Sequence, residues 1–217
     1  MFMSALWDTV FSLNDRYENA EVFLIDNHIP ALRFGHADKP VVFAGGFGAA
    51  EWQSGVLLLQ FFEHLLFDAD HGKSMAGIAV RKAFKKRSVV IIPTVCPPKM
   101  AVEEPLHIED LSPLAKYLSF HPAGMLVCLN GADGAIYAPA SNELLPFESE
   151  TVEKILCACS NLPAGEKSRL VGARFCAWAS QKALLPSFVI SPASLEASAI
   201  AHTYRALEET FAVAALL

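Results

Sequence analysis

The sequence predicts a three-layer α/β/α sandwich with a mostly parallel central sheet and an antiparallel hairpin at one edge. Two observations support this prediction. Short, continuously apolar runs alternate along the chain with longer segments that have helical hydrophobic periodicity. The apolar runs also lack polar alternation, which is typical of strands in a parallel sheet that helices cover on both faces.

Strands are expected wherever these short runs occur. Residues 21–26 and 29–35 form a hairpin signal, because Asn27 and His28 separate two short runs rich in strand-forming residues. This pair is expected to add antiparallel strands at an edge of the sheet. The other runs are apolar throughout and cover residues 40–44, 88–95, 125–129 and 186–190.

Helices are expected around the strands, at residues 4–16, 51–67, 74–86, 111–119, 149–160, 172–184 and 194–215. The helix at 51–67 is apolar nearly all round, which indicates that it is deeply packed. The helix at 74–86 ends in a basic cluster, which we interpret as the cations that favour the negative end of a helix dipole. The cluster consists of Lys82, Lys85, Lys86 and Arg87.

The composition excludes several classes of function. A chain of 217 residues and 23.6 kDa is expected to form a single domain over residues 1–217. Hydrophobic residues make up 53% and charged residues 18%, the opposite of a disordered chain. The most apolar stretch, residues 56–67, is shorter than the roughly 20 residues of a bilayer span. For that reason we expect no membrane partner. The net charge of −6 comes without an evident basic face, so we also expect no nucleic acid as partner.

The cysteines and the first residues together favour a cytoplasmic location. The amino-terminal segment carries no basic region of the kind that opens a signal peptide. The chain has five cysteines, and an odd count without a signal peptide favours reduced thiols.

A functional site is expected beyond the carboxyl ends of the parallel strands, where open α/β sheets bind their ligands. The strand ends lie at residues 46–51, 96–98, 130–133 and 191–194, and none of the seven histidines is among them. The histidines also lack the four-residue spacing of a helical zinc motif. The candidate site residues are Gly48, Glu51, Cys96, Asn130, Asp133 and Ser191.

Four segments resemble the zinc carboxypeptidases of the carboxypeptidase A type. Residues 40–52, Pro-Val-Val-Phe-Ala-Gly-Gly-Phe-Gly-Ala-Ala-Glu-Trp, look like the strand and His-x-x-Glu-Trp motif that open the zinc site of that family. Residues 87–98 look like its Asn-Pro-Asp-Gly strand, and residues 124–131 look like the strand of its second zinc histidine. Residues 186–191 look like the strand that ends in its general-base glutamate. The resemblance covers residues 20–212 and implies a carboxypeptidase-like fold, a zinc cofactor and hydrolysis of peptide bonds.

The chain departs from the family pattern at the positions that hold zinc. The two histidine positions fall on Gly48 and Asn130, and the general-base position falls on Ser191. Only Glu51 matches the family's zinc ligands, whereas a catalytic zinc needs three protein ligands and an open position for water. Residues 99–124 also contain no arginine, although the family uses arginines there to hold the substrate's carboxylate. We therefore expect no bound cofactor.

The preferred hypothesis is a degenerate family member that has lost metallopeptidase activity. Its remnant cleft would bind a peptide or a peptidoglycan fragment, by resemblance to the family's substrates. Glu51 then either contacts the ligand or serves only at the start of its helix. Asp133 is interpreted as a turn residue.

Two alternatives remain open. The first is an active hydrolase with relocated chemistry, in which Cys96 acts as a nucleophile. In another form of it, Glu51 and Asp133 share a metal with His107 or His121. The second alternative is a structural subunit that pairs with an active homologue.

Overall fold

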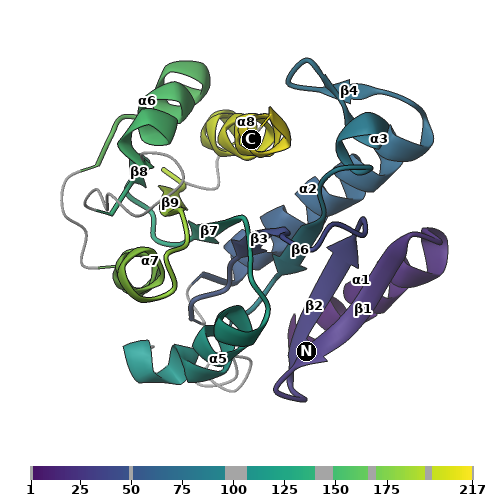
Figure 1. The fold of residues 1–217 in the computed structure, drawn as a ribbon, viewed down its shortest axis with the longest axis horizontal. Helices are drawn as coiled ribbons and strands as arrows, with labels where there is room; N and C mark the ends of the chain where they lie inside the picture. Colours follow the sequence, from purple (N-terminus) through teal and green to yellow (C-terminus); the bar gives the residue numbers. More distant parts are fainter. Residues whose placement is uncertain are drawn as a thin grey trace.

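The computed structural model describes residues 2–48, 51–95, 107–139, 149–165, 170–193 and 197–216. Seven strands form one sheet in the order β1-β2-β6-β3-β7-β9-β8 (Figure 1). The four central strands of this sheet run parallel. They are β3 (Val41–Ala44), β6 (Val89–Ile92), β7 (Met125–Leu129) and β9 (Ser187–Ser191), each buried along its whole length.

Antiparallel strands close both edges of the sheet. β1 (Ala20–Ile25) and β2 (Ile29–Phe34) form the predicted hairpin, and β2 joins it to β6. At the other edge, β8 (Ala135–Tyr137) pairs antiparallel with β9. The sequence did not predict β8, because a strand of three residues is too short to show a period.

Helices cover both faces of the sheet, which confirms the predicted α/β/α architecture (Figure 1). Along β3, Val41 and Phe43 point into one buried cluster while Val42 and Ala44 point into the other. The first cluster lies beneath α1 (Phe2–Arg16), α2 (Trp52–Asp70), α6 (Ser149–Ser160) and α8 (Ala197–Leu216). The second lies beneath α5 (Ser112–Phe120), which follows the 3-10 turn η2 (Ile108–Leu111), and α7 (Val171–Lys182).

The predicted helix at residues 74–86 is wrong for most of its length. The segment forms a two-stranded hairpin of β4 (Ser74–Met75) and β5 (Ile78–Ala79), followed by the short helix α3 (Val80–Ala83). The physical reason lies in the turn, where Ala76 and Gly77 have φ of 45° and 78°. Two successive residues with positive φ make a tight hairpin turn, which interrupts a helix.

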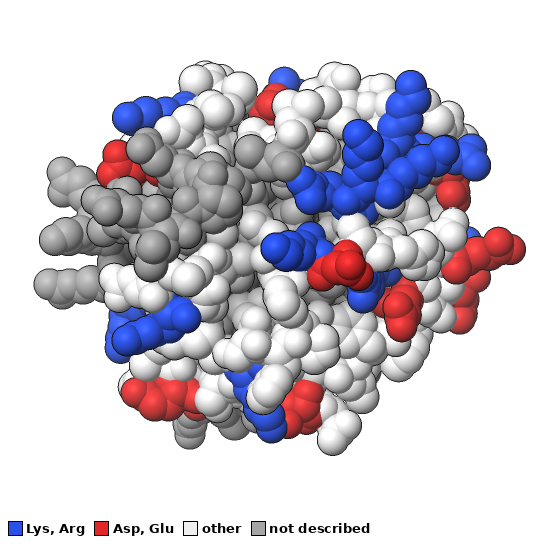
Figure 2. Space-filling view, viewed as in Figure 1, with Lys and Arg blue, Asp and Glu red and all other residues white. Residues whose placement is uncertain are grey.

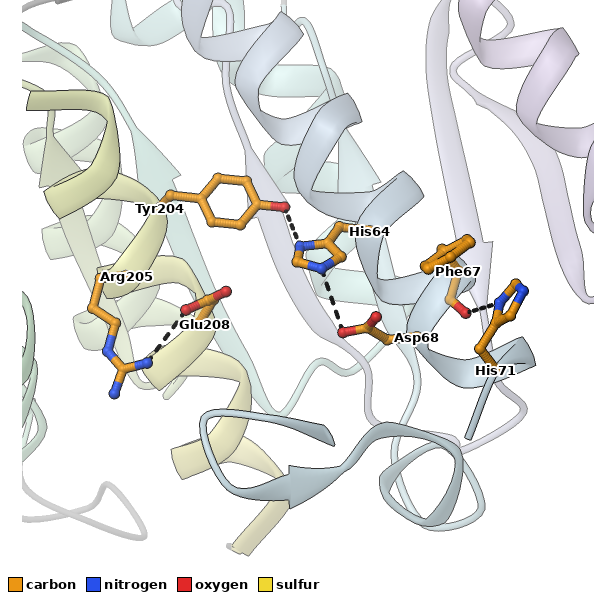
Figure 3. A network of polar contacts seen from close by, with 7 residues as sticks. All are labelled: His64, Phe67, Asp68, His71, Tyr204, Arg205 and Glu208. Carbon is orange, nitrogen blue, oxygen red and sulfur yellow. Dashed lines mark hydrogen bonds and ion pairs between the residues drawn. The ribbon is translucent and has the colours of Figure 1, made fainter. Parts of the chain in front are cut away.

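A chain of polar side chains joins α2 to α8 (Figure 3). The hydroxyl of Tyr204 is hydrogen-bonded to Nδ1 of His64 at 2.8 Å, and Nε2 of His64 lies 3.5 Å from Oδ2 of Asp68. Burial raises the pKa of Tyr204, and the carboxylates of Glu208 and Asp68 add to this. These contacts hold the two helices together on one face of the sheet. Among the described helices, none combines the length and apolar character needed to cross a bilayer.

Candidate functional site

The first turn of α2 lies beyond the carboxyl end of β3. Glu51 is the N-cap residue of α2, and its N–H donates to the carbonyl of Gly48 at 3.0 Å. The carboxylate of Glu51 makes no hydrogen bond to the helix backbone. Instead, Ser54 ties the turn, because its hydroxyl donates to the Glu51 carbonyl at 2.7 Å and accepts the N–H of Gly46 at 2.8 Å. The Glu51 side chain is therefore free to reach across to the neighbouring strand.

The carboxylate of Glu51 binds the end of β7. The side-chain amide of Asn130 donates to Oε2 of Glu51 at 2.5 Å. The N–H of Gly131 donates to the same oxygen at 3.1 Å. Gly131 has a φ of 90°, a conformation that suits glycine. Glu51 thus acts as the acceptor for two donors of the β7 turn.

Asn130 also holds the start of α7. Its side-chain oxygen accepts the N–H of Gly172 at 2.6 Å, and the residue is only 2% exposed. A Cβ at position 172 would lie 2.7 Å from that oxygen, so this approach requires glycine. Because an amide has both a donor and an acceptor, Asn130 can link Glu51 to α7 in a way that a carboxylate could not.

A second pair of contacts fixes the loop between β7 and β8. The hydroxyl of Ser191, which is fully buried, accepts the N–H of Asp133 at 2.8 Å. The hydroxyl of Tyr137 donates to Oδ2 of Asp133 at 2.9 Å. Burial raises the pKa of Tyr137 to about 12, and the hydrogen bond to Asp133 and its negative charge add to the shift. Asp133 is thus held as a turn residue, and its carboxylate remains exposed.

The structure brings the described candidate residues to one edge of the sheet. Backbone contact joins Gly48 to Glu51, and Glu51 joins Asn130. Ser191 and Asp133 meet beside them, because the position of a Cβ on Gly131 would lie 2.9 Å from the Ser191 hydroxyl. The sixth candidate, Cys96, lies outside the described residues. That these residues serve a ligand stays a prediction.

Sequence reasoning missed two members of this network, the backbone N–H groups of Gly131 and Gly172. Backbone donors leave no trace in a sequence. A weak signal did exist for Gly172, because glycine is unfavourable inside a helix and its presence in the first turn of α7 indicates a close approach.

The donor set at this edge does not fit zinc. Gly48 offers no side chain, and the Asn130 amide points a hydrogen, not a lone pair, at Glu51. One carboxylate cannot supply the three ligands of a catalytic site. Over the described parts of the chain, no three His, Cys, Asp or Glu residues are grouped so that they could hold a metal.

The histidines of the relocated-metal alternative have local partners. His107 is the N-cap of η2, where its N–H binds Oδ2 of Asp110 at 2.8 Å. His121 stacks on Tyr117 at the end of α5, with ring centroids 4.6 Å apart, and lines an open cavity of about 480 Å³ beside β1. Burial raises the pKa of Cys128 well above its usual value, and a contact with Cys176 adds to this shift, so Cys128 is a poor nucleophile.

Comparison with known proteins places this fold among metallocarboxypeptidases. No protein-family model matches the chain, and no curated protein matches it in sequence. Thrombin-activatable fibrinolysis inhibitor superposes with a TM-score of 0.69 at 12% identity, over 95% of this chain and 71% of that one. Its bovine form, in complex with tick carboxypeptidase inhibitor, gives 0.67 at 12%, over 98% and 94%. A metallo-carboxypeptidase from Burkholderia cenocepacia gives 0.66 at 11%, over 95% and 68%. Identities this low show the fold alone, and they confirm the carboxypeptidase-like fold that the sequence predicted.

Proposed function

We propose that this chain is a carboxypeptidase-like protein that has lost zinc-dependent peptidase activity and keeps a cleft for a peptide or a peptidoglycan fragment. We place this cleft at the carboxyl ends of β3, β7 and β9, because α/β sheets bind ligands at that edge. Binding there, rather than hydrolysis, is the activity we assign.

The hydrogen bond between Asn130 and Glu51 carries this proposal. At the position where the family pattern has its second zinc histidine, an amide donates to the one carboxylate that matches the family. The geometry therefore satisfies Glu51 without a metal. A hydrolytic site of this class also needs a base, and the Ser191 hydroxyl is fully buried and engaged by Asp133.

Two polar side chains at this edge of the sheet support a binding function. The exposed Asp133, on a turn that the network fixes, and the partly exposed Tyr137, at the end of β8, lie next to the buried network. A rigid turn that carries polar groups binds a peptide without first having to become ordered. Peptides and peptidoglycan fragments are the substrates that the family resemblance implies.

Two titrations test the proposal. Calorimetry with zinc on the purified chain is expected to show no binding at micromolar concentration, and a panel of peptides with free carboxyl ends is expected to remain uncleaved with zinc present. One equivalent of bound zinc together with cleavage would overturn the loss of activity.

The second titration uses a muramyl peptide and a set of tripeptides as ligands. At least one is expected to bind, and Asp133→Ala is expected to weaken that binding about tenfold, as loss of a polar contact does. Asp38→Ala is the matched control, because Asp38 is also exposed but lies in the turn between β2 and β3. Absence of binding by every ligand would favour the structural-subunit alternative over a binding cleft.

A further inference from the structure

A basic surface covers α3 and the β4–β5 hairpin. Figure 2 shows Lys and Arg side chains gathered over this part of the molecule, although the chain as a whole carries a net charge of −6. The hairpin brings Lys73 close to the start of α3, because the N–H of Val80 donates to the carbonyl of Lys73 at 3.2 Å. We define the basic surface as the exposed residues Lys73, Arg81, Lys82, Lys85 and Lys86.

The structure removes the helix-dipole explanation for this cluster. A dipole arises from many aligned peptide units, whereas α3 spans only four residues. Lys85 and Lys86 lie beyond the end of α3, in the turn that follows it. The apolar residues of the segment, Val80, Ala83 and Phe84, are buried beneath the surface. The segment therefore exposes its cations above a buried apolar face.

Within the described segments, the cations of the basic surface form no ion pair with a carboxylate. Several carboxylates on the adjoining helices pair elsewhere, because Glu63 of α2 pairs with Arg16, and Glu208 and Glu209 of α8 pair with Arg205. Asp70, the last residue of α2, is exposed and belongs to none of these pairs, but one carboxylate does not neutralise five cations. The surface is thus left to an external anion.

An exposed apolar residue lies at the end of α8, close to the point where Arg87 joins that helix. Arg87, directly after the basic surface, donates from Nε to the carbonyl of Ala214 at 3.0 Å and so ties the surface to the end of α8. Leu216, two residues further on, is 77% exposed. Peripheral membrane proteins bind through two contributions, attraction between basic side chains and anionic headgroups and insertion of apolar side chains. The lysines of the basic surface and Leu216 offer one of each.

We infer that the basic surface binds the anionic headgroups of a lipid membrane. Nucleic acid is the less favoured partner, because four of the five cations are lysines, which lack the planar fork that reads phosphates and bases. The nearest exposed ring, Phe67, is covered by the Lys73 ammonium at 4.6 Å and by His71 at 4.0 Å, so it offers no face for base stacking. The inference concerns attachment to a surface, which requires no membrane-spanning helix, and it does not depend on the proposed function.

Sedimentation with sucrose-loaded vesicles tests the inference. The full chain is expected to bind vesicles of phosphatidylcholine that contain about 30% phosphatidylglycerol and not vesicles of phosphatidylcholine alone, with binding lost at high salt. The triple variant Lys82→Gln, Lys85→Gln, Lys86→Gln is expected to lower the partition coefficient about 100-fold. Leu216→Gln is expected to lower it about tenfold.

A matched control removes the same charge elsewhere. Lys116, Lys154 and Lys182 are exposed and lie on α5, α6 and α7, so replacing all three with Gln is expected to change binding less than threefold. Equal loss in both triple variants would overturn the site, because it would show that total charge alone matters. Equal binding to neutral vesicles, or tighter binding to duplex DNA than to anionic vesicles, would overturn the membrane assignment. Thermal unfolding of each variant confirms that it is folded.

Discussion

The side-chain amide of Asn130 donates a 2.5 Å hydrogen bond to the carboxylate of Glu51, from a position 79 residues further along the chain. The same amide accepts the N–H of Gly172, so one buried side chain holds the first turns of α2 and α7 against the end of β7. Three elements that are distant in sequence therefore share one polar centre. The predictions on Glu51, Gly172 and zinc binding follow from this arrangement.

Replacement of Glu51 tests its role as an acceptor. Glu51→Ala leaves the Asn130 amide and the Gly131 N–H without a partner, and it is expected to lower the free energy of unfolding by about 1–3 kcal/mol. Glu51→Gln keeps an acceptor oxygen at the same place and is expected to cost less than about 1 kcal/mol. Urea unfolding measures both variants. Equal losses in the two would show that the negative charge, and not the hydrogen bonding, is what matters.

Gly172→Ala tests the close approach of Asn130. A Cβ there would meet Oδ1 and Cβ of Asn130 at 2.7 and 2.8 Å, so the substitution is expected to destabilise by about 1–3 kcal/mol. In the Asn130→Gly background all of these obstructing side-chain atoms are gone. The same substitution is then expected to stabilise by up to about 1 kcal/mol, because alanine favours a helix more than glycine does. A double-mutant cycle with no coupling between the two positions would contradict the contact.

Two histidines introduced at the family's ligand positions test whether these positions converge. The double variant Gly48→His, Asn130→His creates a His, Glu, His set around Glu51, and calorimetry is expected to show zinc binding that the wild type lacks. The affinity is expected to be on the order of micromolar, because the groups that orient natural zinc ligands are missing.

The double variant is also expected to be less stable, by roughly 2–5 kcal/mol. Asn130→His gives up two hydrogen bonds, and Gly48 has a φ of 156°, which strains any other residue. The site around Gly48 is open, so no clash adds to this cost. Peptide cleavage is expected to stay undetectable. If a well-folded double variant bound no more zinc than the wild type, Gly48 would not face Glu51.

The stability of the chain is expected to depend on pH through Glu153 of α6. Burial raises the pKa of this carboxyl above 4.5, although the N–H of Ala138 donates to it at 3.0 Å and partly opposes the shift. Because the pKa is raised in the folded state, protonation of Glu153 stabilises the fold below about pH 4.5. This stabilisation is lost as the pH rises through the pKa of Glu153 in the folded protein.

Glu153→Gln is uncharged at every pH and keeps an acceptor for Ala138. Relative to the wild type, it is expected to be more stable at about pH 7, by less than about 1 kcal/mol because the group is only partly buried, and to lose that advantage near pH 4. Thermal unfolding across this pH range measures the difference. A difference that grows on acidification would show that the shift has the opposite sign.

Much of this fold can be predicted from the sequence, because parallel strands that are buried on both faces must be apolar throughout. That rule located β3, β6, β7 and β9, and the topology of such sheets then brought Glu51, Asn130 and Ser191 to one edge. Residues 74–86 were misjudged because Ala76 gives no sign of the positive φ that it adopts here. The hydrogen bond between Asn130 and Gly172 could not be predicted from the sequence. It depends on the distance between β7 and α7, which only the folded chain sets.

The Asn130 network also bears on the evolutionary history of the chain. On the proposed function, a return to a metal enzyme would need histidines at 48 and 130 and a carboxylate at 191. A histidine at 130 would give up the hydrogen bonds to Glu51 and Gly172, and the fully buried Ser191 sits against Gly131. The steps at 130 and 191 each break contacts that now stabilise the fold, and no step restores activity by itself. Selection for stability therefore opposes each of these substitutions when it occurs alone. Substitutions on the protein surface do not disturb the buried network, so new functions can arise there more easily.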